Sequence, residues 1–175
     1  MKYIPRFIEP VIWESSQTFK VVFLGGPRQV GKTTVLKKLA ENKKFSYITL
    51  DDLNQRELAQ KDPALFLQQL PLPAIIDEVQ YAPELFSQIK KIVDQSGKNG
   101  QFWLTGSQQF SLIRNIQESL AGRVAVLNIL GLSMAEKNLD RMSGKYPFGG
   151  IYRKPKINDL FRDIFAGGFP IFQSK

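Results

Sequence analysis

The sequence of 175 residues contains no cysteine and no histidine. The absence of cysteine excludes disulfide bonds, thiolate nucleophiles and cysteine-ligated zinc sites, and it fits a cytoplasmic protein. The absence of histidine excludes imidazole base catalysis and most transition-metal sites. Any chemistry in this chain therefore uses carboxylates, lysine, arginine, hydroxyl groups or the backbone.

Long apolar runs are also missing from the sequence. None approaches the ~18–20 residues that a helix needs to span a bilayer. The start, MKYIPRFIEPVIWE, contains proline and glutamate where a signal peptide requires an apolar stretch. A hydrophobic fraction of 43% and thirteen Phe suffice for one buried core, and the chain is too short for two ordinary domains. We expect a globular cytoplasmic protein with no membrane partner.

The formal net charge is +8, and the basic excess lies in residues 1–60 and 136–175. Such an excess can bind the phosphates of a nucleotide or of a nucleic acid. The alternative is a solvated basic surface without a partner. Composition alone leaves both interpretations open.

Five short apolar segments alternate with amphipathic helical patterns. The expected strands are residues 20–25, 46–50, 74–77, 102–105 and 124–130. The expected helices have apolar contacts within residues 35–40, 53–58, 62–70, 85–93 and 112–120. Strands separated by helices in this way predict an α/β fold, in which a parallel sheet is covered on both faces.

We divide the chain into a lead-in (1–18), a core (19–132) and a helical tail (133–175). In the tail, Ser133 and Glu136 form a capping-box pattern that predicts a short helix. Residues 144–156 predict a loop or linker. An apolar stripe over residues 157–165 predicts a last helix, which ends at the glycine pair that follows.

Residues 26–33 read GPRQVGKT and match the pattern G-x-x-x-x-G-K-[ST] of a phosphate-binding loop. Lys32 is expected on the β- and γ-phosphates, and Thr33 offers its hydroxyl to Mg²⁺. A chance match is the alternative, but the motif follows a strand and opens a helix, as phosphate binding requires. Arg28 either contacts phosphate or points to solvent. The predicted nucleotide contacts are Gly26, Pro27, Arg28, Gln29, Val30, Gly31, Lys32, Thr33 and Thr34.

Two carboxylates, Asp77 and Glu78, end the third apolar segment. In a parallel sheet this end lies at the same edge as the phosphate-binding loop. Asp77 is then expected to support Mg²⁺, and Glu78 to orient and deprotonate the attacking water. The alternative is that the two acidic residues simply begin a loop.

Several segments follow in a fixed order: GGPRQVGKTT, LDD, IIDEVQYAPELF, FWLTGSQQF and SLAGRVAVLNILGLSMAE. Together they resemble the N-terminal ATPase domain of a prokaryotic AAA-type P-loop ATPase family. Members of that family carry a C-terminal, nuclease-like domain of unknown function. The resemblance implies a three-layer P-loop NTPase sandwich with a five-stranded parallel sheet of order 5-1-4-3-2 and a small C-terminal helical tail.

The resemblance implies two further catalytic positions. A polar side chain at the end of the fourth strand would sense the γ-phosphate, and Ser107 is the first choice and Thr105 the second. A turn rich in Gly and Ser is the alternative. Arg123, just before the fifth strand, resembles the arginine that reaches a nucleotide in its own chain or in a neighbouring subunit. A surface arginine is the alternative there.

The FAGGFP segment at 165–170 resembles the junction at which the C-terminal domain of that family begins, five residues before this chain ends. We therefore expect the chain to be an N-terminal fragment. Its partner would be the C-terminal domain or another copy of the chain.

We expect Mg²⁺-dependent hydrolysis of ATP, used as a conformational switch. A small-molecule P-loop kinase is one alternative, although Glu78 suits water activation, and residues 141–153 offer only Arg141 and Arg153 for a lid. Another alternative is a module that binds nucleotide and a partner or DNA with little hydrolysis. Phosphate release with and without acceptors separates the first two, and tight binding without turnover indicates the third.

Overall fold

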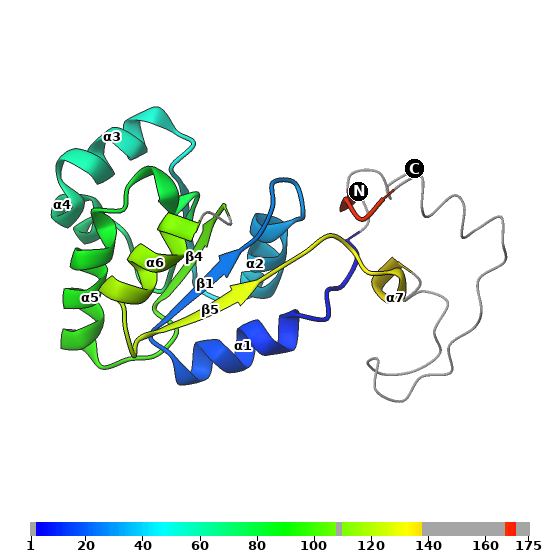
Figure 1. Ribbon diagram of the computed structural model, residues 1–175. Coiled ribbons are helices and arrows are strands. Elements are labelled where there is room, and N and C mark those ends of the chain that lie inside the picture. The colour runs from blue at the N-terminus through cyan, green and yellow to red at the C-terminus, as the bar shows by residue number, and fades with distance from the viewer. Residues whose placement is uncertain (1–2, 108–109, 138–166, 171–175) are drawn as a thin grey trace, which may run out of the picture.

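The computed structural model describes residues 3–107, 110–137 and 167–170. Helices and strands alternate along most of the chain (Figure 1). In order they are α1 (Glu9–Thr18), β1 (Val21–Gly25), α2 (Lys32–Ala40), β2 (Ser46–Thr49), α3 (Leu53–Lys61), α4 (Pro63–Gln68), β3 (Ala74–Asp77), the 3₁₀ helix η1 (Val79–Tyr81), α5 (Leu85–Ser96), β4 (Phe102–Gly106), α6 (Phe110–Ser119), β5 (Val124–Asn128) and α7 (Met134–Lys137).

The five strands form one parallel sheet in the order β2-β3-β4-β1-β5. This is the predicted order read from the opposite side, so the fold prediction is confirmed. Gly25 at the end of β1 pairs with Gly106 and Asn128 at the ends of its neighbours. The carboxyl ends of β1, β4 and β5 therefore share one edge of the sheet. Ligands of open α/β sheets bind at this edge.

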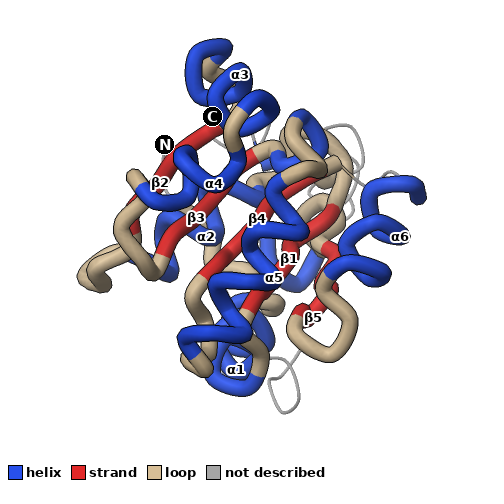
Figure 2. Tube along the Cα trace, turned by 90° about the vertical axis from the view of Figure 1, so that its left-hand side faces the viewer, coloured by secondary structure: helices blue, strands red, loops and turns tan. Residues whose placement is uncertain are grey.

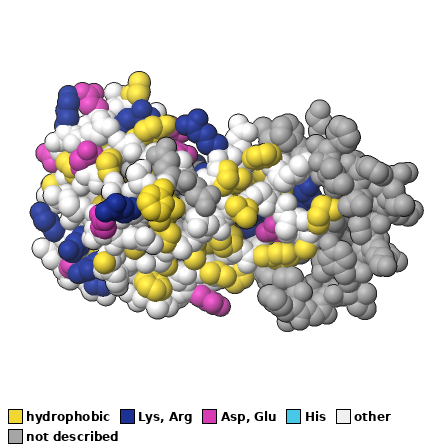
Figure 3. Space-filling view, in the orientation of Figure 1, with side chains coloured by type: hydrophobic (Ala, Val, Ile, Leu, Met, Phe, Trp, Pro, Cys, Tyr) yellow, Lys and Arg dark blue, Asp and Glu magenta, His cyan; other side chains and the backbone are white. Residues whose placement is uncertain are grey.

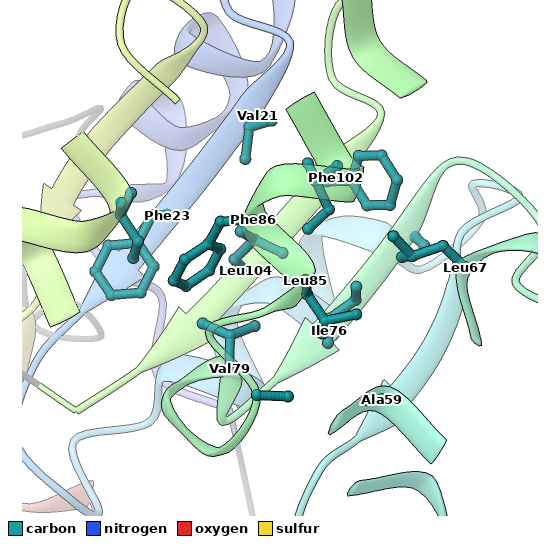
Figure 4. Close-up of a cluster of buried hydrophobic side chains, with 14 of the residues drawn as sticks. Val21, Phe23, Ala59, Leu67, Ile76, Val79, Leu85, Phe86, Phe102 and Leu104 are labelled. Carbon is teal, nitrogen blue, oxygen red and sulfur yellow. The ribbon is translucent and has the colours of Figure 1, made fainter. Parts of the chain in front are cut away.

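The sheet separates two hydrophobic clusters. Alternate strand residues such as Phe23, Ile76 and Leu104 pack with α3, α4, α5 and α6 on one face (Figure 4). The opposite strand positions, including Leu24 and Trp103, pack with α1 and α2 on the other face. Figure 2 shows α5 crossing in front of the strands. Because both faces are covered, the central strands are mostly apolar, and the polar Asp77 and Thr105 lie near the carboxyl ends of β3 and β4.

Helix α1 lies in the segment that sequence analysis treated only as a lead-in. Pro10 occupies its first turn, and Ile12 is fully buried. Its other buried residue is polar: the Ser16 hydroxyl accepts a hydrogen bond of 2.9 Å from Nε1 of Trp103. The sequence pattern gave no helix here because α1 lacks a continuous apolar stripe.

The predicted capping box is confirmed at the start of α7. The Ser133 hydroxyl accepts from the backbone N–H of Glu136 at 3.1 Å, and Oε2 of Glu136 accepts from the N–H of Ser133 at 2.8 Å. The expected loop at 144–156 and the expected helix at 157–165 lie outside the described residues. Within the described tail, the Gly168 carbonyl accepts from the N–H of Leu132.

No helix in the described part of the chain is both long and apolar enough to cross a membrane.

Candidate nucleotide-binding site

The loop between β1 and α2 has a backbone that depends on its glycines. Gly31 has a φ of 92° and forms the N-cap of α2. A Cβ on Gly26 would lie 2.3 Å from the carbonyl oxygen of Ile129, closer than any side chain tolerates. Gln29 also adopts a left-handed conformation, with a φ of 63°. The loop therefore has the tightly turned backbone that the motif requires.

Lys32 lies inside this loop. Its ammonium donates to the carbonyl oxygens of Gly26 at 3.0 Å and Pro27 at 2.8 Å. The residue is only 5% exposed. Burial lowers the pKa of Lys32, while the negative charges of Glu78 and Asp77 oppose that decrease. The loop therefore holds a buried cation next to two carboxylates.

Asp77 ends strand β3 and contacts three hydroxyl groups. The Thr33 hydroxyl lies 2.8 Å from Oδ1 and 3.0 Å from Oδ2. Thr105, at the end of β4, donates to Oδ1, and the Tyr47 hydroxyl donates to Oδ2 at 3.1 Å. The predicted pair of Thr33 and Asp77 is thus brought together.

Tyr47 is a site residue that sequence analysis missed. Burial, the Asp77 charge and the hydrogen bond to Asp77 raise the pKa of Tyr47 to about 12, so the phenol remains a donor at neutral pH. One feature of the sequence could have indicated Tyr47: it lies two residues before the end of β2, the strand that pairs with β3. Strand order was needed to use that signal.

Glu78 follows Asp77 in a left-handed conformation, with φ 60° and ψ 45°. Its backbone N–H donates to the Thr105 hydroxyl at 3.2 Å, and its carboxylate accepts from the Gln80 side chain. Oε1 of Gln80 accepts in turn from the N–H of Ser107 at 3.3 Å. Such a backbone conformation is costly for a residue other than glycine and is maintained by these surrounding contacts. Gln80 is a second residue that sequence analysis missed.

The two candidate sensor residues differ in their contacts. Thr105 is fully buried and bonded to Asp77. The Ser107 hydroxyl is buried and has no hydrogen-bond partner among the described residues. An unsatisfied buried hydroxyl at a sheet edge is a group that a ligand can satisfy. The neighbouring Gln108 lies outside the described residues.

The two predicted arginines differ in where they lie. Arg28 is exposed, and its positive charge contributes to the lowered pKa of Lys32. Arg123 precedes β5 and therefore lies at the amino-terminal edge of the sheet, where its guanidinium pairs with Asp94 at 2.5 and 2.9 Å. A residue that precedes a parallel strand lies at the opposite edge from the loop that follows β1. The structure thus does not bring Arg123 to the phosphate-binding loop of its own chain, and its action from a neighbouring subunit stays a prediction.

A cavity of about 140 Å³ adjoins the phosphate-binding loop. Apolar and aromatic side chains make up most of its wall. Its lining residues are Tyr3, Ile4, Arg6, Gly31, Thr34, Val35, Leu132 and Pro170. Sequence analysis did not predict it, because its wall combines the first residues of the chain, α2 and the tail.

The donor set fits Mg²⁺. This ion prefers oxygen ligands, and it is commonly held by one or two protein groups together with water and phosphate. The Thr33 hydroxyl and the Asp77 carboxylate supply such oxygens at the start of α2. The glycine-dependent backbone next to them fits a polyphosphate.

The basic surface that the composition predicted is mixed with acidic groups. On the face shown in Figure 3, Lys and Arg side chains are scattered among Asp and Glu. Ion pairs of the described residues include Lys61 with Glu57 and Arg114 with Glu118. Binding of a nucleic acid stays a prediction.

A family model described as an AAA domain matches residues 18–138. The chain belongs to this family. It is 36% identical over 117 residues to uncharacterized proteins of Mycobacterium tuberculosis (Rv2008c) and Mycobacterium bovis (Mb2031c). That alignment covers 66% of this chain and 26% of each relative. The part of this chain that matches therefore corresponds to about a quarter of the length of these relatives.

Solved structures with the same fold include a Walker-type ATPase of Pyrococcus abyssi, PABY2304. It is 17% identical, with a TM-score of 0.55 over 79% of this chain and 57% of that chain. Domain III of the Thermotoga maritima replication initiation protein DnaA is 18% identical, with a TM-score of 0.54 over 78% of this chain and 68% of that chain. At these identities, the similarity establishes that this AAA domain has the P-loop ATPase fold.

Proposed function

We propose that this AAA domain binds ATP together with Mg²⁺ and hydrolyses it to ADP and phosphate, using the reaction as a conformational switch. The observation that carries the proposal is the contact of the Thr33 hydroxyl with both oxygens of Asp77. This contact joins the end of the phosphate-binding loop to the end of β3. A cation held by both side chains would lie beside the phosphates.

Lys32 would bind the β- and γ-phosphates. Its ammonium donates to two loop carbonyls, those of Gly26 and Pro27. In the complex, phosphate oxygens would replace these carbonyls, and a contact between opposite charges would be stronger than the contact of the cation with uncharged carbonyls. Bound Mg²⁺ would neutralise charge on the same oxygens.

Glu78 would act as the general base. Its carboxylate would accept a proton from the water whose oxygen attacks the γ-phosphorus, while the bond from that phosphorus to the departing ADP oxygen breaks. The Gln80 side chain holds this carboxylate toward the end of β4. Ser107 lies at that end, and its hydroxyl, which has no partner in the part of the chain that the structure describes, would donate to the γ-phosphate.

The cavity beside the loop would take the base of the nucleotide. Gly31 and Thr34 form the side of the cavity that adjoins the phosphates. Tyr3, Ile4 and Val35 contribute an apolar and aromatic wall, which suits a flat heteroaromatic ring. One ligand would therefore extend from this cavity into the loop.

One observation favours a second candidate, a module that binds nucleotide with little hydrolysis on its own. The guanidinium of Arg123 pairs with Asp94 at the other edge of the sheet. If turnover needs an arginine at the γ-phosphate, a second copy of the chain or a C-terminal domain would supply it. The AAA domain would then bind nucleotide, and the partner would complete the reaction.

Titration with a fluorescent ATP analogue, with and without Mg²⁺, followed by measurement of phosphate release, tests the proposal. Mg²⁺-dependent binding together with phosphate release is the expected result. Binding without release would favour the second candidate. Absence of binding would contradict both.

A further inference from the structure

The side chain of Tyr47 contacts the same carboxylate as the threonine of the phosphate-binding loop. Its hydroxyl donates to Oδ2 of Asp77 at 3.1 Å. The two residues lie on neighbouring strands but are not directly opposite, because Tyr47 pairs with Ile75 and Thr49 pairs with Asp77. The tyrosine side chain is long enough to span this diagonal.

A lysine of α2 contacts the aromatic ring of Tyr47. The ammonium of Lys37 lies 3.5 Å from the ring centroid, and Lys37 follows Thr33 by one helical turn. A cation over the face of a ring stabilises its position. Tyr47 is 39% exposed, so its contacts are with α2 and Asp77 rather than with the centre of a hydrophobic cluster.

The two strand-borne hydroxyls hold opposite oxygens of the carboxylate. Thr105 comes from β4 and donates to Oδ1, whereas Tyr47 comes from β2 and donates to Oδ2. These are the strands on either side of β3. Hydrogen bonds to both oxygens fix the plane of a carboxylate. The Thr33 hydroxyl contacts both oxygens of Asp77 from the phosphate-binding loop.

We propose that Tyr47 is a positioning residue that orients the Asp77 carboxylate for Mg²⁺. The inference rests on the proposed function, since it concerns the same metal site. Groups that hydrogen-bond a metal ligand orient it, and their removal typically lowers metal affinity by roughly 10–100-fold. Tyr47 does not itself touch the metal or the nucleotide in this proposal.

The test is Tyr47→Phe, which removes the hydroxyl and keeps the ring on Lys37. Binding of a fluorescent ADP analogue is measured over a Mg²⁺ titration and again with EDTA. We expect the Mg²⁺ concentration for half-maximal effect to rise roughly 10-fold. Nucleotide affinity in EDTA should equal that of the wild type. A residue needed only for folding would weaken both.

Tyr81→Phe is the matched control, because it deletes the same hydroxyl from a tyrosine whose ring faces Arg56 rather than Asp77. Its Mg²⁺ dependence should be that of the wild type. An unchanged Mg²⁺ midpoint in Tyr47→Phe, or an equal shift in Tyr81→Phe, would overturn the inference alone. A wild type whose nucleotide binding ignored Mg²⁺ would overturn the inference and the proposed metal site together.

Discussion

The guanidinium of Arg6 donates to the carboxylate of Glu136 at 3.0 Å, across 130 residues of chain. The two side chains are only 5% and 7% exposed. Arg6 also donates to the carbonyl oxygens of Val30 at 2.9 Å and Leu130 at 2.7 Å. One side chain therefore joins the first residues of the chain, the phosphate-binding loop and the start of α7.

Replacing Glu136 by Gln should destabilise the domain by roughly 3–5 kcal/mol at neutral pH, because it leaves Arg6 buried without its charged partner. Burial alone would raise the pKa of Glu136, but the N–H groups of Ser133 and Phe7 and the charge of Arg6 outweigh it and lower that pKa. The stabilisation is thus present above the unfolded pKa of about 4.3 and is lost as pH falls through the folded pKa.

Urea unfolding of wild type and Glu136→Gln from pH 7 to pH 3 measures this difference. The gap in the free energy of unfolding should narrow in acid. Glu57→Gln is the control, since Glu57 forms an exposed pair with Lys61 and its loss should change stability little. If the difference in the free energy of unfolding did not depend on pH, the charge of Glu136 would not be the source of the stabilisation.

Replacing Lys32 by Ala should weaken nucleotide binding roughly 30-fold or more, because a charged contact to phosphate is lost. The fold should survive, since the ammonium contacts loop carbonyls rather than either hydrophobic cluster. Titration with a fluorescent nucleotide and circular dichroism measure the two effects.

Lys61→Ala is the control, because this lysine lies on α3 and is paired with Glu57 instead of lying in the loop. It should bind as the wild type does. Unchanged affinity in Lys32→Ala would show that residues 26–33 are not a phosphate-binding loop.

Replacing Ser107 by Ala should leave the free energy of unfolding within about 0.5 kcal/mol of the wild type, because its hydroxyl bonds to no described residue. If this hydroxyl senses the γ-phosphate, turnover should fall roughly 10²-fold. Thr105→Val should instead lower stability by roughly 1.5–3 kcal/mol, because Thr105 bonds to the charged Asp77. Thermal unfolding and phosphate release together separate the two residues.

If turnover fell in Thr105→Val and not in Ser107→Ala, Thr105 and not Ser107 would be the residue that senses the γ-phosphate. Full turnover in Ser107→Ala would remove Ser107 as the sensor and leave Thr105 as the remaining candidate at the end of β4.

The strands were predictable because both faces of a parallel sheet are buried, which makes each strand a short apolar run. The predicted bounds of β3, residues 74–77, agree residue for residue. Strand order is different, because apolar runs do not encode it, and here it came from the family resemblance. The placement of the acidic pair Asp77 and Glu78 beside the phosphate-binding loop followed from the rule that parallel strands bring their carboxyl ends to one edge of the sheet.

Arg6 and Tyr47 were not predictable in this way. Each acts on a partner far along the chain, 130 and 30 residues away respectively. A basic residue near a terminus and a tyrosine in a strand are typical of surface and sheet positions, so nothing local marks them. The placement of Arg123 could have been predicted, because a residue before a parallel strand lies at the edge opposite the loop after β1.

The proposed mechanism depends most directly on Glu78. Glu78→Gln keeps the size of the side chain and an oxygen that can accept from Gln80, but it removes the base. Turnover should therefore fall by roughly 10²–10⁴-fold. Affinity for ATP and Mg²⁺ should be retained, because Lys32, Thr33 and Asp77 are unchanged. Phosphate release at saturating ATP and nucleotide titration measure the two quantities.

Asp77→Asn is the matched variant, since it makes the same acid-to-amide change one residue earlier. It should weaken the proposed metal site, to which Thr33 also contributes, so Mg²⁺ dependence and nucleotide affinity should both change. The contrast between a loss of turnover and a loss of binding separates a base from a metal ligand. Wild-type turnover in Glu78→Gln at saturating ATP would remove Glu78 from the mechanism. Hydrolysis would then need another base, and the reading of the domain as a nucleotide-binding module would be favoured.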